Sequence, residues 1–250
     1  MNESLKIYEV GPRDGLQNED AGVSTENKLA LISGLVSAGL RNIEVTSFVH
    51  PKAVPQMADA DRVMRETLAN HSSRNDRFVG LVFNQRGYDR ALDSGTRSIA
   101  FGVSVSDTFS HQNTGMSAGE LMQGTRNLVD LAKKDGLWTR VYISAAWVCP
   151  FEGVIPPQKA IAYAEQVADM EPDEISVADT VGYANPTDVG HLMEQLARRL
   201  DVNRLAVHLH DTQALGLANA AAAMQAGVRI FDTSIGGIGG CPFAPGAAGN

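Results

Sequence analysis

The sequence contains few cysteines and no concentration of positive charge. Only two of its 250 residues are cysteines, Cys149 and Cys241, which is too few for a disulfide framework and fits a reducing cytoplasm. Lys and Arg number 21 against 29 Asp and Glu, so the formal net charge is −8, and no local basic cluster is present. We therefore do not expect a nucleic-acid partner.

Long apolar runs and targeting signals are also lacking. The most apolar stretches, such as residues 218–226, are short and rich in alanine, well below the roughly 20 residues that a membrane-spanning helix requires. No basic segment of the signal-peptide type precedes the strand-like residues 5–10. With 44% hydrophobic and 20% charged residues, the chain has the composition of a folded protein. The lack of targeting and spanning segments leads us to expect a cytoplasmic protein without a membrane partner.

The sequence alternates strand-like and helix-like segments. Helix starts are marked by Ser24 before residues 25–39, by the capping-box pair Ser117 and Glu120, and by Asn185 before Pro186. A last helix is predicted over residues 214–227. Eight apolar or β-branched runs bounded by turn residues are predicted as strands: 6–10, 42–47, 78–83, 98–105, 140–148, 174–180, 204–210 and 230–235.

This alternation predicts an α/β fold, a closed (β/α)₈ TIM barrel formed by residues 1–250 as a single domain. An open doubly wound sheet is the alternative, but no glycine-rich dinucleotide turn follows the first strand. Little sequence follows the eighth strand. We therefore expect that the eighth helix and a C-terminal segment are absent from this chain and that the natural polypeptide continues beyond Asn250.

Candidate metal ligands lie at the predicted carboxyl ends of strands, which form the functional face of a TIM barrel. His208 and His210 are two residues apart on one strand, so their side chains project to the same side. Barrel closure brings Asp14 beside them, and the Asn250 amide oxygen is a further candidate. Nitrogen and oxygen ligands without a thiolate favour Mg²⁺ or Mn²⁺ over Zn²⁺. The alternative is a pair of hydrogen-bonded histidines in a polar barrel interior.

Arg13, next to Asp14, indicates an anionic substrate, because a guanidinium beside a cation is costly unless an anion lies between them. Glu44 and Asp179 are candidates for holding Arg13 in place, with a purely structural role as the alternative. Cys241 lies in a glycine-rich loop from which its thiol could deliver a proton; otherwise it is a small buried side chain. The loop matches neither a P-loop nor a dinucleotide turn.

Several motifs together resemble one enzyme family. They cover the first, second, seventh and eighth predicted strands and their loops, namely Glu9–Glu19, Ile43–Val49, His208–Asp211 and Gly239–Phe243. This set resembles the 3-hydroxy-3-methylglutaryl-CoA lyases, within a wider group of metal-dependent TIM-barrel lyases and synthases. The resemblance runs from about residue 9 to residue 250.

The resemblance implies retro-Claisen cleavage of 3-hydroxy-3-methylglutaryl-CoA to acetoacetate and acetyl-CoA, and a homo-oligomer, with a dimer favoured. The cation ligands it implies are Asp14, His208, His210 and Asn250. Arg13 would stabilise the enolate, Cys241 would be the catalytic thiol, and either Asp14 or His208 would be the base. Glu44 and Asp179 would support these groups, and the residues implied to bind substrate are Arg13, Gln17, Ser47, Asp179 and Thr180.

The segment from Ala178 to Pro186 departs from the lyase pattern and looks closer to the related Claisen-condensing synthases. Two alternative activities therefore stay open. One is a lyase for another short 3-hydroxy-acyl-CoA, and the other is a synthase that uses acetyl-CoA and a 2-oxo acid. A third possibility is an acyl-CoA-binding protein without activity, since a fold alone does not guarantee catalysis.

Overall fold

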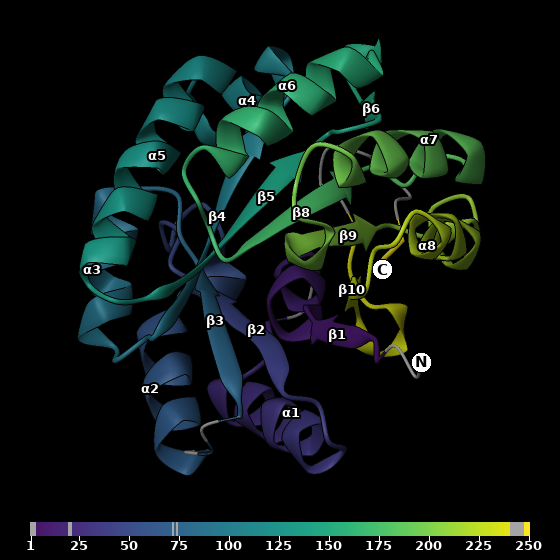
Figure 1. Ribbon diagram of the computed structural model, residues 1–250. Helices are drawn as coiled ribbons and strands as arrows, with labels where there is room; N and C mark the ends of the chain where they lie inside the picture. The colour runs from purple at the N-terminus through teal and green to yellow at the C-terminus, as the bar shows by residue number, and fades with distance from the viewer. Residues whose placement is uncertain (1–3, 20–21, 72, 74, 241–247) are drawn as a thin grey trace.

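The computed structural model describes residues 4–19, 22–71, 73, 75–240 and 248–250, and these form a closed barrel of eight parallel strands (Figure 1). The TIM-barrel prediction is confirmed, and the open-sheet alternative is wrong. In order around the barrel the strands are β1 (Lys6–Glu9), β10 (Ile230–Thr233), β9 (Leu205–Leu209), β8 (Glu174–Asp179), β5 (Trp138–Ser144), β4 (Ser98–Ser104), β3 (Arg77–Leu81) and β2 (Asn42–Ser47).

Helices cover the outside of the barrel (Figure 1). They are α1 (Thr25–Ser37), α2 (Ala60–Asn70), α3 (Gln85–Asp93), α4 (Asp107–Thr114), α5 (Ala118–Lys134), α6 (Pro157–Ala168), α7 (Pro186–Ala197) and α8 (Gly216–Gln225). The predicted caps are confirmed: Ser24 and Asn185 each accept a backbone N–H, and Ser117 forms a full capping box with Glu120. No helix within the described residues is both long and apolar enough to cross a bilayer.

The fifth predicted strand is the one whose end differs most from the structure. It was expected to run to residue 148, but β5 ends at Ser144. Ala145 has a φ of 55°, and this left-handed conformation breaks the extended backbone. Residues 148–149 instead form β6 (Val148–Cys149), which pairs with β7 (Gly153–Val154) in an antiparallel hairpin that the sequence did not predict.

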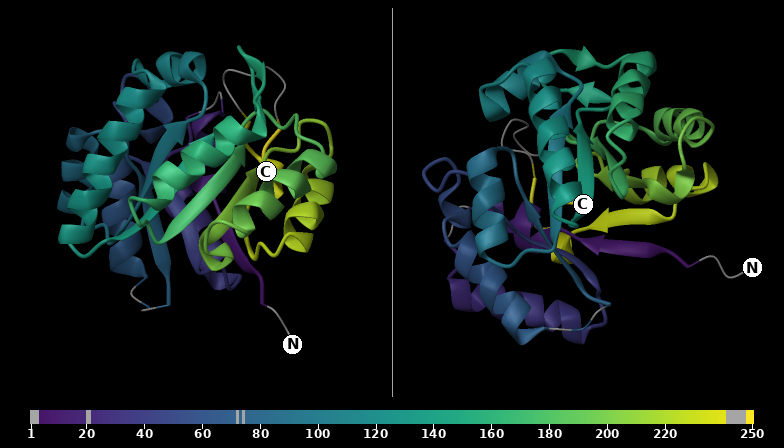
Figure 2. Two further views of the ribbon diagram at one scale, coloured as in Figure 1. Left: turned by 45° about the horizontal axis from the view of Figure 1, so that its top comes forward. Right: turned by 60° about the vertical axis from the view of Figure 1, so that its left-hand side comes forward.

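Pairing of the first and last strands closes the barrel. Lys6 lies opposite Ile230 and Glu9 opposite Thr233, and the right-hand view of Figure 2 shows β1 and β10 side by side. After β10 the described residues hold only a short 3₁₀ turn, η4 (Ile235–Gly237), before Gly240. Continuation of the natural chain beyond Asn250 stays a prediction. Closure places the loop after β1 next to β9 and β10, where the candidate ligands lie.

Three further short segments belong to the loops of the barrel. A π-helical turn, η1 (Gly11–Gly15), follows β1, and 3₁₀ turns occupy η2 (Pro55–Met57) and η3 (Val202–Arg204). In η1, a Cβ at Gly11 would come within 2.6 Å of Glu9 Oε1, the atom that accepts the Gly11 N–H. A side chain at this position would have to displace the buried Glu9 carboxylate, so glycine suits the turn that leads to Arg13 and Asp14.

Candidate active site

Three potential ligand atoms converge at the mouth of the barrel. His208 on β9 and His210 just after it place their Nε2 atoms 3.0 Å apart. Asp14 in η1 places Oδ2 at 3.6 Å from His208 Nε2 and 3.7 Å from His210 Nε2. All three residues are buried, and their ligand atoms lie within 4.8 Å of one another. The sequence prediction that barrel closure unites these residues is confirmed.

The hydrogen bonds of the two rings identify which nitrogens can bind a cation. His208 Nδ1 lies 3.0 Å from Asp232 Oδ2, and His210 Nδ1 lies 2.6 Å from the Ala248 carbonyl oxygen. Both partners only accept, so each Nδ1 carries the hydrogen and each Nε2 presents a lone pair. Two such lone pairs and the Asp14 carboxylate facing one another repel unless a cation lies between them. The donor set therefore fits a divalent metal ion.

Asn250 contacts His208 on the opposite side of the ring. Its Nδ2 is 2.8 Å from His208 Nδ1, and its Oδ1 has no hydrogen-bond partner in the described part of the chain. The Asp232 carboxylate is the stronger acceptor for the hydrogen on His208 Nδ1, so that nitrogen carries a hydrogen and cannot accept one from Asn250 Nδ2. If the Asn250 amide is turned by 180°, its Oδ1 instead lies beside the same hydrogen and can accept it. Asn250 thus contacts the Nδ1 side of His208 and is not among the residues that line the pocket, and its role as a cation ligand stays a prediction.

The charge states of these groups suit cation binding. Burial alone raises the pKa of Asp14, but the Arg13 guanidinium and the two imidazoles outweigh it, and the net pKa is lowered. The pKa of Asp232 is lowered in the same way, against burial, by Arg140 and a histidine ring. Burial and the neighbouring imidazole lower the pKa of His210 to about 4. At neutral pH the two carboxyls are ionised and His210 is neutral.

Arg13 is held by two carboxylates from different segments. Its Nε donates to Glu44 Oε1, and its Nη1 donates to Asp14 Oδ1 at 2.6 Å. Glu44, fully buried on β2, also accepts from the Tyr142 hydroxyl at 2.6 Å. Burial lowers the pKa of Arg13, but the two carboxylates raise it by more, and the net pKa is above its ordinary value. The guanidinium is therefore permanently charged. Its Nη2 has no hydrogen-bond partner among the described residues and remains available to a ligand.

Asp179 does not hold Arg13, which corrects the expectation from sequence. Its carboxylate accepts from the backbone N–H groups of Tyr183 at 3.2 Å and Ala184 at 2.9 Å. Side chains alternate along a strand, and Ala178 faces the pocket, so Asp179 on β8 faces away from it. Burial raises the pKa of Asp179 to about 6 despite these backbone donors.

A pocket of about 750 Å³ opens above these groups at the carboxyl ends of the strands. It is lined by most of the predicted site residues: Arg13, Asp14, Gln17, Ser47, Thr180, His208 and His210. Residues of α4 and of the loop before η2 also line it, and no role was predicted for them from the sequence. Cys241 lies outside the described residues, although Gly240, immediately before it, lines the pocket.

Three residues that support the site were not predicted from the sequence. Tyr142 supports Glu44, Asp232 supports His208, and Arg140 supports Asp232 through a 2.5 Å ion pair. The sequence did contain a signal for buried polar groups. Arg140 and Tyr142 are two residues apart within one predicted strand, so they lie on the same side of it, and Asp232 is a charged residue within another predicted strand that is otherwise mostly apolar. Polar residues on the inner side of barrel strands are costly unless they have partners there.

Comparison with protein families places almost the whole chain in one group. The model of the HMGL-like family matches residues 4–250. The hydroxymethylglutaryl-CoA lyase YngG of Bacillus subtilis is 40% identical over 248 residues, covering 99% of this chain and 82% of that protein. The (R)-citramalyl-CoA lyase of Chloroflexus aurantiacus is 42% identical over 256 residues, covering 99% and 80%.

Solved structures agree with this grouping. The crystal structure of the Bacillus subtilis HMG-CoA lyase matches with a TM-score of 0.94 at 40% identity, covering 99% of this chain and 82% of that one. An HMG-CoA lyase from Acinetobacter baumannii, in complex with coenzyme A and 3-methylmalate, matches with a TM-score of 0.93 at 34% identity, covering 99% and 80%.

Proposed function

The chain belongs to the HMGL-like family of carbon–carbon lyases, and we propose that it cleaves 3-hydroxy-3-methylglutaryl-CoA to acetoacetate and acetyl-CoA with a divalent cation. The observation that carries the proposal is the meeting of Asp14, His208 and His210 beside Arg13 in one pocket. That arrangement combines a cation site with a fixed positive charge, which are the two features that a retro-Claisen cleavage needs.

Asp14, His208 and His210 would hold the cation, with Asn250 as a further ligand. Oxygen and nitrogen donors without a thiolate favour Mg²⁺ or Mn²⁺ over Zn²⁺. When bound, the cation supplies Lewis acidity that lowers the pKa of the substrate 3-hydroxyl. The lowered pKa values of Asp14 and His210 leave these two ligands free of protons at neutral pH.

Bond cleavage would begin when a base removes the proton of the 3-hydroxyl, and we propose either Asp14 or His208 as that base. The C2–C3 bond then breaks, C3 becomes the ketone carbon of acetoacetate, and the electron pair moves to the thioester as an enolate. Arg13 lines the pocket, and its guanidinium would stabilise the enolate oxygen. Loss of a comparable donor in other enzymes costs about 3–4 kcal/mol. Cys241 would protonate the enolate carbon to give acetyl-CoA.

The remaining predicted residues have separate roles. Gln17, Ser47 and Thr180 line the pocket and would contact the acyl-CoA. Glu44 would keep the Arg13 guanidinium in place. Asp179 would order the loop after β8 through the Tyr183 and Ala184 amides, rather than touch substrate. We further propose a cytoplasmic homodimer, which size-exclusion chromatography with light scattering tests for its oligomeric part.

Citramalyl-CoA is the second candidate substrate, because the Chloroflexus enzyme is 42% identical to this chain. Both thioesters carry a 3-hydroxyl and a 3-methyl group, and they differ by one methylene in the carboxylate arm. A hydrophobic pocket distinguishes one methylene by only about 1–3 kcal/mol, so contacts to the carboxylate decide the preference. None of the relatives named above is a condensing synthase.

The deciding experiment incubates the protein and Mn²⁺ with each thioester in turn and identifies products by mass spectrometry, with a chelator control. We expect acetoacetate and acetyl-CoA from 3-hydroxy-3-methylglutaryl-CoA, and no product after chelation. Asp14→Asn should abolish turnover, whereas Asp93→Asn, an exposed carboxylate on α3, should not. Pyruvate from citramalyl-CoA at a much higher rate would move the assignment to the second candidate, and turnover in chelator would remove the cation from the proposal.

A further inference from the structure

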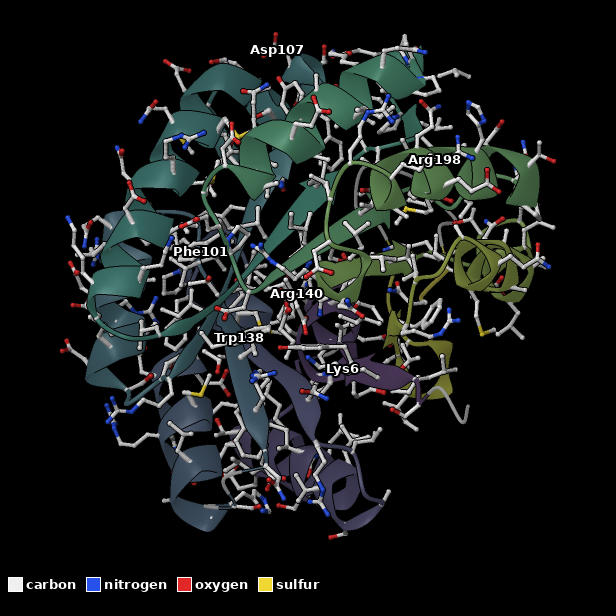
Figure 3. All side chains as sticks on the ribbon, in the orientation of Figure 1. Lys6, Phe101, Asp107, Trp138, Arg140 and Arg198 are labelled. Atoms are coloured by element: carbon white, nitrogen blue, oxygen red, sulfur yellow. The ribbon has the colours of Figure 1, made fainter. Side chains whose placement is uncertain are left out.

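Beneath the pocket, the barrel encloses a fully buried arginine that the mechanism above does not use. Arg140 on β5 lies at the centre of the ring of strands, as its label in Figure 3 shows. Its guanidinium carbon is 4.2 Å from the ring centre of Tyr8 and 4.9 Å from that of Tyr142. The guanidinium is thus stacked against aromatic faces and cannot turn freely.

One arm of contacts connects Arg140 to the cation site. Arg140 Nη2 donates to Asp232 Oδ1 at 2.5 Å, and the other oxygen of the same carboxylate, Oδ2, lies 3.0 Å from His208 Nδ1. A carboxylate held at one oxygen by a bulky cation can accept from the imidazole only in one direction. The orientation of His208 Nε2, a proposed ligand atom, is therefore set from below by Asp232 and Arg140.

A second arm connects Arg140 to Arg13. The Tyr142 ring, which Arg140 contacts with its face, donates its hydroxyl to Glu44 Oε2 at 2.6 Å, and Glu44 Oε1 accepts from Arg13 Nε. Tyr142 also lies edge-on to His208, with ring centres 5.8 Å apart. The Arg140 guanidinium is thus connected both to the proposed cation ligand His208 and to Arg13.

A purely stabilising role explains Arg140 poorly. Its Nε and Nη1 have no hydrogen-bond partner in the described residues, and Glu174 Oε2, 3.9 Å from Nε, also has none. Burying charged groups with unmade hydrogen bonds costs stability, and apolar residues of similar size usually stabilise such a position as well or better.

We propose that Arg140 is a positioning residue for the whole site: through Asp232 it fixes the His208 ring, and through Tyr142 and Glu44 it fixes Arg13. The inference rests on the proposed cation-dependent function. Arg140 touches neither the ligand atoms nor the pocket, so its effect passes through these two arms only.

The test measures Mn²⁺ affinity by calorimetry on metal-free protein. Outer residues that orient a metal-binding histidine usually contribute about 10–100-fold to affinity, and we expect Arg140→Met to weaken Mn²⁺ binding by that factor. Arg77→Met is the matched control, because the Arg77 guanidinium also stacks on an aromatic ring, Trp138 at 4.2 Å. We expect a change below about threefold for Arg77→Met. Equal losses in both variants, or no loss in Arg140→Met, overturn the proposal.

Two further measurements separate positioning from general damage. Nitrogen-15 NMR of the histidine rings in metal-free protein should show His208 protonated at Nδ1, and a mixture of tautomers in Arg140→Met. In a double-mutant cycle, Asp232→Asn combined with Arg140→Met should bind Mn²⁺ no more weakly than Asp232→Asn alone. Additive losses would show that Arg140 does not act through Asp232.

If Arg140→Met does not fold, Arg140→Lys carries the test, because it keeps the charge but loses the planar fork. A loss of Mn²⁺ affinity of at least about fivefold supports the proposal, and an unchanged affinity overturns it. Failure of the proposed function looks different. If the wild-type protein binds Mn²⁺ but cleaves neither thioester, the proposed activity is refuted and the role of Arg140 is not. If the wild-type protein binds no Mn²⁺, the His208 tautomers measured by NMR decide whether Arg140 positions that ring.

Discussion

The two faces of the barrel wall have opposite compositions. Toward the helices the strands present a large apolar core, whereas toward the barrel axis only a small apolar cluster surrounds charged groups. Strand β5 shows both: Val141 and Ile143 pack outward, and Arg140 and Tyr142 point inward. Because side chains alternate along a strand, one segment stabilises the fold with one set of residues and builds the site with the other.

The largest effect is expected from an inward change at Arg13. Arg13→Lys keeps the charge but loses the fork that contacts Glu44 and Asp14 and that would, in the proposed mechanism, also contact the enolate. We expect kcat to fall about 100–1000-fold, as for loss of an oxyanion donor, with the protein still folded. Steady-state kinetics and a thermal melt measure both. A variant that keeps more than half of its activity would remove Arg13 from catalysis.

An outward change should show the reverse pattern. Ile143 is fully buried in the outer core, and Ile143→Ala should lower the free energy of unfolding by about 2–5 kcal/mol. We expect kcat/KM at 25 °C to stay within about twofold for the folded fraction. Ile143→Val, with a loss of about 0.5–1.5 kcal/mol, is the graded control. A tenfold loss of kcat/KM without unfolding would break the comparison between the two faces.

Asp179 offers a pH test on the side facing away from the pocket. Its pKa is raised to about 6, above the ordinary value of 3.8, so the folded state holds this proton more tightly than the unfolded state. Stability from this group is present at low pH and is lost as pH rises from about 4 to about 6, by about 2 kcal/mol. Asp179→Asn should lack this loss in urea melts across that range. Parallel pH profiles would contradict the raised pKa.

The smallest expected effect lies on the surface. Ser117 caps α5, and its hydroxyl accepts the Glu120 N–H. Ser117→Ala should cost about 1 kcal/mol of unfolding free energy and leave kcat and KM unchanged. Chemical denaturation and kinetics on the same preparation check this. A change in KM would contradict this prediction, because it would show that the α5 cap affects substrate binding.

Local patterns predicted the fold and only part of the site. Alternation of strands and helices identified the barrel, and closure then brought Asp14 to His208 and His210. The support beneath them was missed because Arg140 and Asp232 meet across the barrel interior. That contact depends on strand register, which no local pattern reports. Asp179 was misassigned for a related reason, since one residue of shift along a strand turns a side chain to the other face.

Closure of the barrel by β1 and β10 also sets when the site can form during synthesis. Asp14 is translated before His208, His210 and Asp232, which follow it by roughly 200 residues. At about 5–20 residues per second, the first strand waits tens of seconds for its final neighbour. Until β10 is made, the edge of β1 opposite β2 has no partner strand, and an unpaired strand edge is open to contacts with other chains. If these residues bind a metal ion as proposed, binding would therefore require that the ribosome has delivered β10.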